Sequence, residues 1–256
     1  MQVDLNADIG EGRSGSVGQD AVLIRHITSA NIACGFHAGD AALMRATVQS
    51  ARDNGVAVGA HPGFPDVEGF GRRELQFSPS DVEDFVAYQV GALGAIAAAE
   101  GVRLQHVKPH GALFNMAARD AALADAIARA AAVIDATLIL FGPPGSELAA
   151  AARRCGLRFA AEGFADRAYH SDGRLVSREQ AGAVIHDPET VVQRAVRMVC
   201  AHTIESIDGA TLPIIIDTMC VHGDTPGAAE LAARIRTGLT DAGVDVRPLS
   251  PPPARA

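Results

Sequence analysis

Residues 100–104, EGVRL, decide the fold because they join the end of one expected helix to the start of one expected strand. The glycine suits the left-handed conformation that commonly ends a helix, and the alternating run after it suits a strand. The same phrase recurs at 54–58 (NGVAV), 155–159 (CGLRF) and 242–246 (AGVDV). Helix, glycine and strand in repetition indicate right-handed β-α-β units, so we expect a mostly parallel sheet with helices outside it.

Three helix starts carry local signals of their own. An apolar stripe at helical spacing covers residues 82–93, and Ser80 with Glu83 three positions later predicts a capping box in front of it. The dipeptides at 187–188 (DP) and 225–226 (TP) predict two more helix starts, because proline is favoured in the first turn.

Short apolar or alternating runs mark the candidate strands, and polar residues cluster at the carboxyl ends of most of them. An open doubly wound sheet would gather such residues at one switch point. We therefore predict an α/β protein whose β/α barrel has about seven parallel strands. Residues 163–187, with an Asp-Gly turn at 172–173, predict a small inserted hairpin that could act as a lid. The candidate strands are 2–8, 30–36, 56–60, 103–108, 137–141, 157–162 and 213–221, with a weak eighth near 244–248.

Length and composition fit one domain. With 256 residues and 48% apolar content the chain can bury a full core, and one β/α barrel typically takes about 250 residues. We expect a single catalytic barrel domain over residues 1–250 and a disordered, proline-rich tail over residues 251–256.

Charge and cysteine usage bear on partners and location. A net charge of -8 argues against nucleic acid and an anionic membrane surface, since both favour basic patches. No apolar run approaches the roughly 20 residues that cross a bilayer. Four scattered cysteines without CxxC spacing, and a start that leads directly into VDLNAD without a signal segment, predict a reducing, cytoplasmic location.

The first strand presents three polar side chains on one face. Alternation in residues 3–8, VDLNAD, places Asp4, Asn6 and Asp8 together and the apolar residues opposite. Polar groups on the inner face of a core strand are costly unless they are used. The alternative is an edge strand with one solvated face.

Residues 106–110, HVKPH, repeat this pattern with His106, Lys108 and His110 on one face. Lys108 is the only lysine among 22 basic residues, so this position keeps an ammonium where the rest of the chain uses arginine. A buried ammonium between two imidazoles predicts a depressed lysine pKa, suited to proton transfer or charge stabilisation. In the alternative interpretation, either histidine merely hydrogen-bonds a carbonyl group.

Three further strand ends carry histidine or cysteine, at 33–40 (ACGFHAGD), 59–63 (GAHPG) and 220–224 (CVHGD). With the first and fourth strands they could supply a divalent-metal site, although their spacing matches no fixed local ligand motif. For Cys220 we expect a small buried apolar filler rather than a nucleophile. The candidate metal side chains are Asp8, His37, His61, His110, His222 and Asp224.

The loop at 63–74, GFPDVEGFGRRE, is glycine-rich and contains paired arginines. It is typical of a mobile flap in which Arg72 and Arg73 clamp a carboxylate or phosphate, or else of an ordinary exposed loop. Residues 10–15, GEGRSG, match the dinucleotide-binding GxGxxG pattern. We reject that function because the preceding strand presents Asp, Asn and Asp and is not apolar on both faces. A P-loop is excluded as well, because the only lysine lies in HVKPH.

Motifs spread over nearly the whole chain resemble the LamB/YcsF family. They are DLNADIGEG, ANIACGFHAGD, GAHPGFPD followed by GFGRR, HVKPHGALFN, EGFADRAY with DGRLVSR, and MCVHGDTPGA. The resemblance implies a barrel similar to the glycoside hydrolase and polysaccharide deacetylase type. It also implies that ATP hydrolysis to ADP and phosphate drives the opening of the 5-oxo-L-proline lactam to L-glutamate, with two further subunits as partners.

On this reading the polar strand ends receive roles in lactam opening. Asp4 or Asp8 would act as general base or hold the attacking water, and Lys108 with His110 would stabilise charge on the lactam or phosphate oxygen. Other positions would contact substrate or a metal ion. For substrate these are Asn6, Asn31, Arg72, Arg73 and Asp224, and for a metal they are His37, His61 and His222.

Two other functions fit the same residues. The Asp and His strand ends also suit a stand-alone metal-dependent amidohydrolase or deacetylase on the same barrel. The missing phosphate loop suits a non-catalytic subunit that binds the lactam and hands it to a partner holding the ATP site.

Overall fold

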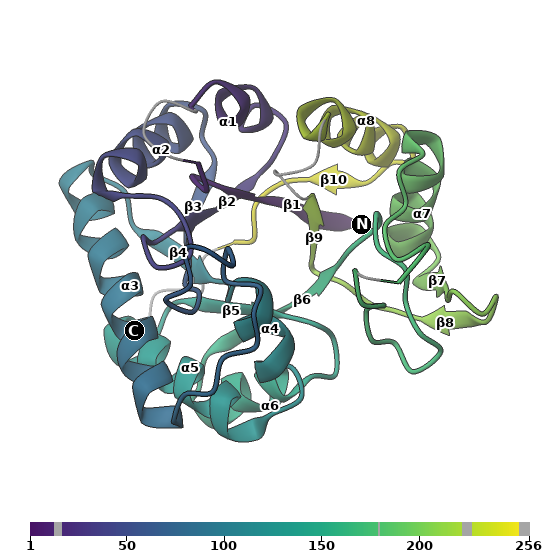
Figure 1. Cartoon of the computed structure of the whole chain (residues 1–256). Helices are drawn as coiled ribbons and strands as arrows, with labels where there is room; N and C mark the ends of the chain where they lie inside the picture. Colours follow the sequence, from purple (N-terminus) through teal and green to yellow (C-terminus); the bar gives the residue numbers. More distant parts are fainter. Residues whose placement is uncertain (13–16, 179, 222–226, 251–256) are drawn as a thin grey trace.

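Seven parallel strands close into a barrel, as predicted (Figure 1). The computed structural model describes residues 1–12, 17–178, 180–221 and 227–250. The strands follow one another around the ring, and the last one pairs with β1 to close it. They are β1 (Gln2–Ile9), β2 (Ser29–Ala33), β3 (Ala57–His61), β4 (Leu104–Val107), β5 (Ile139–Gly142), β6 (Arg158–Gly163) and β9 (Thr218–Val221).

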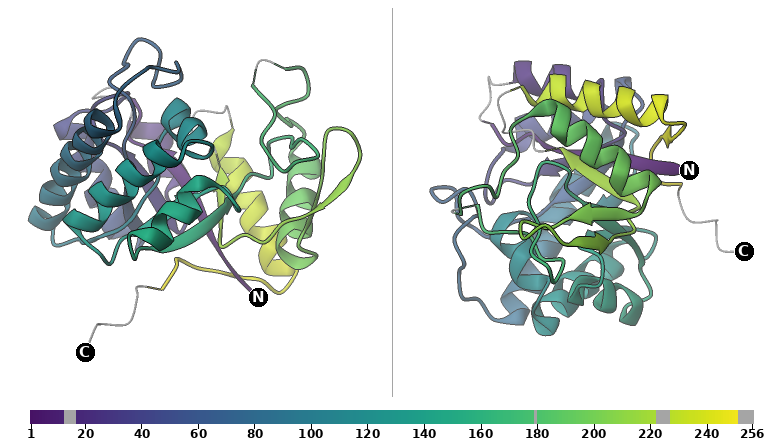
Figure 2. Two further views of the ribbon diagram at one scale, coloured as in Figure 1. Left: turned by 90° about the horizontal axis from the view of Figure 1, so that it is seen from below. Right: turned by 90° about the vertical axis from the view of Figure 1, so that its right-hand side faces the viewer.

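Helices surround the strands, and one large hydrophobic cluster lies between the two layers (Figures 1 and 2). Val3, Leu5 and Ala7 of β1 belong to this cluster, so the alternate residues of the strand face the barrel interior. The helices are α1 (Val17–Leu23), α2 (Ala41–Asp53), α3 (Pro79–Ala99), α4 (Gly111–Ala117), α5 (Ala121–Ile134), α6 (Glu147–Arg154), α7 (Pro188–Cys200) and α8 (Ala228–Asp241).

The repeated glycine phrase ends four helices as expected. Gly55, Gly101, Gly156 and Gly243 follow α2, α3, α6 and α8 with φ angles of 68°, 73°, 71° and 78°. This backbone region strains residues with a side chain, which explains why glycine occupies each turn into the next strand or extended segment.

The capping prediction for α3 is wrong by two residues. The helix begins at Pro79, and its cap is Ser78, whose side chain accepts from the backbone of Asp81 while the Asp81 side chain accepts from the Ser78 backbone. Proline fits the first helical position, so the helix starts before Ser80. Asp187 does cap α7, whereas residues 225–226 lie outside the described residues.

The expected strand over 213–221 is two separate strands. Its start belongs to β8 (Thr211–Pro213), which forms an unpredicted antiparallel ribbon with β7 (Thr203–Glu205), and only β9 joins the barrel. The weak eighth strand exists as β10 (Asp245–Val246), which pairs with β1 beside the ring.

The segment over 163–187 forms the expected turn beside the barrel (Figure 2). The His170 backbone N–H donates to the Arg174 carbonyl at 2.8 Å, and Tyr169 forms an antiparallel bridge with Leu175.

The last described residues cover the amino-terminal end of the barrel. Leu249 packs with Ile139, Phe141 and Ala160, and its carbonyl oxygen accepts from Gln105 near the start of β4. The polar interior therefore opens toward the carboxyl ends of the strands.

In the described part of the chain, α3 is the one helix whose length and composition would allow it to cross a membrane. Its buried residues Val82, Val86, Val90 and Leu93 instead join the main core, where α3 packs against α5 and β3.

Candidate active site

A continuous network of polar side chains occupies the barrel interior. Asn6 donates to Glu162 Oε1 at 3.0 Å and to Thr218 Oγ1 at 2.7 Å across the barrel. Asn31, from β2, donates to Asn6 Oδ1 at 2.7 Å and to Asp8 Oδ1 at 2.8 Å. The inner face predicted for the first strand is thus confirmed, and the edge-strand alternative is wrong because β1 pairs on both sides.

His106 lies at the floor of this network and hydrogen-bonds an amide carbonyl, as the alternative interpretation expected. Its Nε2 lies 2.7 Å from Asn31 Oδ1, and its ring stacks on Phe141 with centroids 4.2 Å apart. Burial lowers the pKa of His106 to about 3, so the ring is neutral. Gly59 leaves room for this ring, since a Cβ there would overlap His106 Nε2.

Lys108 lies between two acidic side chains and not merely between two imidazoles. Its Nζ donates to Asp8 Oδ1 at 2.8 Å, and Glu162 Oε1 lies 2.9 Å away. Burial alone would lower the pKa of Lys108, but the negative charge of Asp8 and its hydrogen bond to the ammonium raise this pKa well above its ordinary value. The expected depressed pKa is therefore wrong, because these partners come from strands distant in sequence.

Cys220 is a buried thiol beside this ammonium, with Sγ 3.1 Å from Lys108 Nζ. Burial raises the pKa of Cys220 well above its ordinary value. A protonated thiol is a poor nucleophile, which agrees with the expected filler role.

Asp4 lies deeper in the barrel than Asp8 and is fully buried. Its carboxyl group accepts from Thr28 at 2.7 Å, from Ser29 at 2.6 Å and from Thr218. Burial raises the pKa of Asp4, against the effect of these hydroxyls. Asp4 and Asp8 therefore differ in their partners. Asp8 pairs with Lys108, whereas the Asp4 carboxyl group accepts hydrogen bonds from hydroxyl groups.

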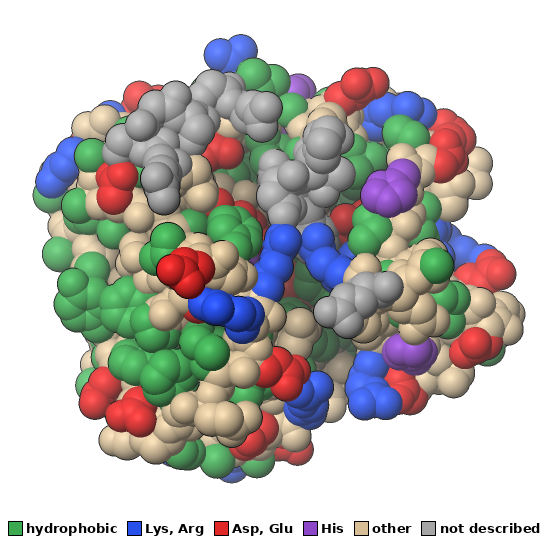
Figure 3. Space-filling model, in the orientation of Figure 1, with side chains coloured by type: hydrophobic (Ala, Val, Ile, Leu, Met, Phe, Trp, Pro, Cys, Tyr) green, Lys and Arg blue, Asp and Glu red, His purple; other side chains and the backbone are tan. Residues whose placement is uncertain are grey.

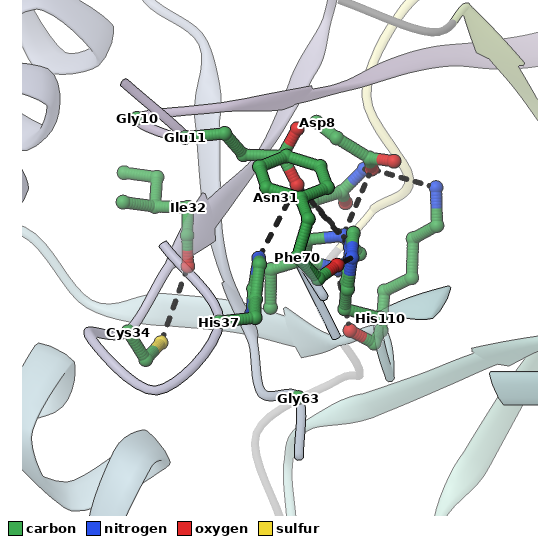
Figure 4. Close-up of polar contacts among 12 residues, drawn as sticks. Asp8, Gly10, Glu11, Asn31, Ile32, Cys34, His37, Gly63, Phe70 and His110 are labelled. Carbon is green, nitrogen blue, oxygen red and sulfur yellow. Dashed lines mark hydrogen bonds and ion pairs between the residues drawn. The ribbon is translucent and has the colours of Figure 1, made fainter. Parts of the chain in front are cut away.

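Four further side chains converge beside Asp8 at the carboxyl ends of consecutive strands, and Figure 4 shows three of them, Glu11, His37 and His110. His61 ends β3, and Glu11, His37 and His110 follow β1, β2 and β4. One ligand atom from each lies within 4.8 Å of the others. Glu11 Oε1 is 3.2 Å from His110 Nδ1, 3.3 Å from His37 Nε2 and 3.8 Å from His61 Nε2. We call these four residues the histidine cluster.

Two backbone carbonyl groups set the protonation of His61 and His110. His61 Nδ1 lies 2.7 Å from the carbonyl oxygen of Lys108, and His110 Nε2 lies 2.8 Å from that of Phe70. Both nitrogens carry hydrogen because a carbonyl oxygen only accepts. The remaining nitrogens, His61 Nε2 and His110 Nδ1, are 2.9 Å apart. In neutral rings their lone pairs would face each other, an arrangement that a shared metal ion would satisfy.

The histidine cluster has the donor set of a divalent-metal site. Burial lowers the pKa of His37 to about 4, so this ring is neutral. Burial acts to raise the pKa of Glu11, but hydrogen bonds from His110 and His37 hold it at about 2. Neutral imidazoles with one carboxylate suit zinc or a similar ion, and ligand atoms at bond lengths of about 2.0–2.1 Å lie roughly 3 Å apart.

The sequence analysis identified the three histidines of this cluster but missed two acidic residues of the site. Glu11 lies in the DLNADIGEG motif, and Glu162 is the first residue of EGFADRAY. Neither residue is spaced from other polar residues in a pattern that would have predicted its position in the site. His222 and Asp224, expected as metal and substrate ligands, lie outside the described residues.

The loop at 63–74 is fastened to the histidine cluster. Phe70 adopts φ 53°, unusual for a residue with a side chain, and presents its carbonyl oxygen to His110. The Gly71 carbonyl accepts from the Ala112 backbone at 2.9 Å. Arg72 is exposed and stacks on Phe70, with Cζ 5.0 Å from the ring centroid.

Arg73 does not lie where it could form the expected substrate clamp together with Arg72. It forms an ion pair with Asp66 in the same loop. Of the expected arginine pair, Arg72 is the member whose guanidinium lies over Phe70 beside the histidine cluster. Blue arginine side chains gather around the hollow at the barrel mouth in Figure 3.

Fold and site together define a β/α-barrel protein whose reactive side chains lie at the carboxyl ends of the strands, where enzymes of this architecture carry their active sites. The chain belongs to the LamB/YcsF family, whose family model matches residues 3–253.

Named relatives match over nearly their whole length. A protein of Heliobacterium modesticaldum that is named as a 5-oxoprolinase subunit is 53% identical over 96% of this chain and 98% of its own. The protein of the same name from Bacillus licheniformis is 50% identical over 97% and 99%.

Solved structures agree with this placement. A lactam utilization protein from Thermus thermophilus superposes with a TM-score of 0.92 at 46% identity, covering 97% of this chain and all of that one. A family 4 carbohydrate esterase from Streptomyces lividans, with a TM-score of 0.51 at 16% identity over 100% and 96% of the chains, shares the fold.

Proposed function

We propose that this chain is the lactam-opening subunit of a 5-oxoprolinase, which converts 5-oxo-L-proline to L-glutamate. The observation that carries the proposal is the match at about half identity, over nearly the full length, to proteins named as 5-oxoprolinase subunits. Such a name implies a complex, and we propose two further subunits as partners. We also propose a cytoplasmic location, where ATP is available.

Asp8 and Lys108 are suited to the two charge changes of amide hydrolysis. Asp8 Oδ1 lies 3.5 Å from His61 Nε2 and 2.8 Å from Lys108 Nζ, so it can hold water between the network and the histidine cluster and accept its proton. The Lys108 ammonium can stabilise negative charge that develops on the lactam oxygen. Asn6 and Asn31 orient these two groups through their hydrogen bonds.

A divalent metal ion would be held by the four residues of the histidine cluster. Bound there, it would supply a Lewis acid that polarises the lactam carbonyl or an attacking water. The carbonyl groups of Phe70 and Lys108 fix the orientation of two of the rings, as partners of metal-bound histidines commonly do.

ATP supplies the activation that a stable five-membered lactam needs, by phosphorylation of the amide oxygen. Since the sequence has no phosphate loop, we propose that ATP binds with the help of the partner subunits. Arg72 at the mouth is placed to bind the substrate carboxylate or a phosphate, whereas Arg73 is paired with Asp66. Asp4 serves to hold β1, β2 and β9 together through its hydroxyl partners.

The histidine cluster also favours a second function, a metal-dependent amidohydrolase or deacetylase that works without partners. Such an enzyme would cleave an N-acetyl substrate without ATP and would contain stoichiometric metal. The two functions separate in one assay that compares the chain alone with the chain plus its co-encoded partner subunits.

Our proposal predicts little or no 5-oxoproline turnover by the isolated chain, and 5-oxoproline-dependent ATP hydrolysis with glutamate release once the partners are added. Both products are measured in the same reaction. ATP-independent turnover of an N-acetyl substrate by the isolated chain would instead support the amidohydrolase.

A further inference from the structure

Glu162 is a buried acid that the reaction outlined above does not use. It lies near the carboxyl end of β6 with its side chain inside the barrel, and the residue is 1% exposed. Asp8, the other acid on Lys108, keeps 13% of its side chain exposed. Two carboxyl groups of unequal burial therefore share one ammonium.

The hydrogen bonds of Glu162 are divided unequally between its two oxygens. Oε1 accepts from Asn6 Nδ2 at 3.0 Å and lies 2.9 Å from Lys108 Nζ. Oε2 is equally buried and has no hydrogen-bond partner within the described residues. An ionised oxygen without solvent or a donor is costly, whereas a protonated one can remain there while Oε1 keeps both of its donors.

The surrounding charges also favour a protonated Glu162. The ammonium of Lys108 is nearer to balancing one carboxylate than two, and Asp8 is the more solvated of the pair. Burial raises the pKa of Glu162, with Lys108 acting against this and Asp8 adding to it. The titratable groups that face Glu162 from the neighbouring elements are Asp4, Asp8, Lys108, Tyr169 and Cys220.

We propose that Glu162 is a neutral carboxylic acid, protonated on Oε2, and that it donates this proton to the ring nitrogen when the lactam opens. The inference rests on the proposed function. In that step the water oxygen bonds to the carbon of the phosphorylated amide, the bond from this carbon to nitrogen breaks, and the nitrogen takes the Glu162 proton. The phosphoryl group remains on the carboxyl oxygen and leaves as inorganic phosphate when a second water attacks phosphorus. Asp8, which keeps part of its side chain exposed, takes the proton from water and releases it to solvent, and Glu162 regains a proton as the product leaves, so that each turnover ends with Lys108 still protonated and Glu162 restored.

The protonation state can be tested without any assay of activity. In the isolated chain at neutral pH, the infrared difference between wild type and E162Q should contain the C=O stretch of a buried protonated carboxylic acid, which shifts in D2O. The control is E100Q, because Glu100 lies outside the barrel and pairs with Arg45 and Arg52. Its difference spectrum should show loss of an ionised carboxylate instead. If Glu162 contributes an ionised carboxylate band, the proposal is wrong.

The catalytic role of Glu162 is tested in the complex with the partner subunits. E162Q keeps an acceptor for Lys108 and Asn6 but has no acid proton, so kcat should fall by about 10²–10⁴-fold with KM little changed. E162D, which keeps a carboxylic acid, should retain measurable turnover. Wild-type activity should decline at high pH as Glu162 loses its proton, and E162Q should lack this decline.

Wild-type kcat and an unaltered pH profile in E162Q would overturn the catalytic role. Should E162Q fail to fold, infrared spectra of wild type and E162D, each labelled with ¹³C at glutamate carboxyl groups, decide the protonation state. If the wild-type complex does not turn over 5-oxoproline, the proposed function is wrong, but the infrared result on the protonation of Glu162 still stands.

Discussion

Lys108 shows how a single residue depends on partners from the whole barrel. Its neighbours in the sequence are histidines, which led to the expectation of a depressed pKa. Asp8, which comes from β1 far away in the sequence, reverses that direction through its charge and its hydrogen bond. A lysine that stays protonated is suited to stabilising negative charge on a reacting oxygen rather than to exchanging protons as a base.

Replacing Lys108 with arginine should be nearly as damaging to turnover as replacing it with methionine. The ammonium fits among Asp8, Glu162 and Cys220 at 2.8–3.1 Å, and a planar guanidinium is too large for the same contacts. We expect kcat in the complex to fall by about 10²-fold or more in both variants, in the range seen when an oxyanion-stabilising donor is removed.

Melting temperatures of both Lys108 variants, measured in parallel, show whether the loss of turnover reflects unfolding. Wild-type turnover in K108R would mean that charge alone matters at this position. Unfolding of both variants would mean that Lys108 holds the barrel together.

At the scale of helices and strands, the sequence correctly predicted the features that depend on neighbouring residues alone. Helix, glycine and strand recur because each glycine ends its helix through its own backbone, and this repeat predicted the parallel sheet with helices outside it. The prediction of one strand over 213–221 failed because its start pairs with the nearby β7, whereas its end, as β9, pairs with the distant β1.

In the candidate site, too, the sequence predicted the residues that follow a local pattern and missed those that depend on distant contacts. Alternation along β1 and the HVKPH motif identified Asp8, Lys108 and His110, since parallel strands bring their carboxyl ends together. Glu11 follows its strand in a glycine-rich turn without alternation, and Glu162 is one acid in an otherwise apolar run. Their roles depend on contacts across the barrel that one strand's sequence does not contain.

The corrected cap of α3 makes a prediction about stability. Ser78→Ala removes the side chain that accepts from the Asp81 backbone, and loss of such a cap typically costs about 0.5–2 kcal/mol. Ser80→Ala is the matched control, because Ser80 is an exposed residue within the first turn, and such changes usually stay within about 0.5 kcal/mol.

Urea denaturation of both variants measures the difference in the free energy of unfolding. Equal effects of the two substitutions, or a larger effect of Ser80→Ala, would show that the cap lies where the sequence pattern first placed it.

At the scale of the whole molecule, the barrel gathers side chains from most of its strands at one end, and the last described residues, which include Leu249, cover the other end. Water and substrate therefore meet the polar network from the mouth, where Arg72 and the histidine cluster lie. This arrangement supports a subunit that performs the ring opening itself, in contrast to one that only binds the lactam.

The central claim, that this chain performs the ring opening, is tested most directly by Asp8→Asn in the complex with the partner subunits. The asparagine keeps the shape and a hydrogen-bonding oxygen for Lys108 and Asn31 but is a far weaker base. Glutamate release should fall by about 10²–10⁴-fold, as expected for loss of a general base, while the affinity for 5-oxoproline changes little. Full turnover in this variant, with only the substrate affinity altered, would contradict the account and leave the chain as a binding subunit.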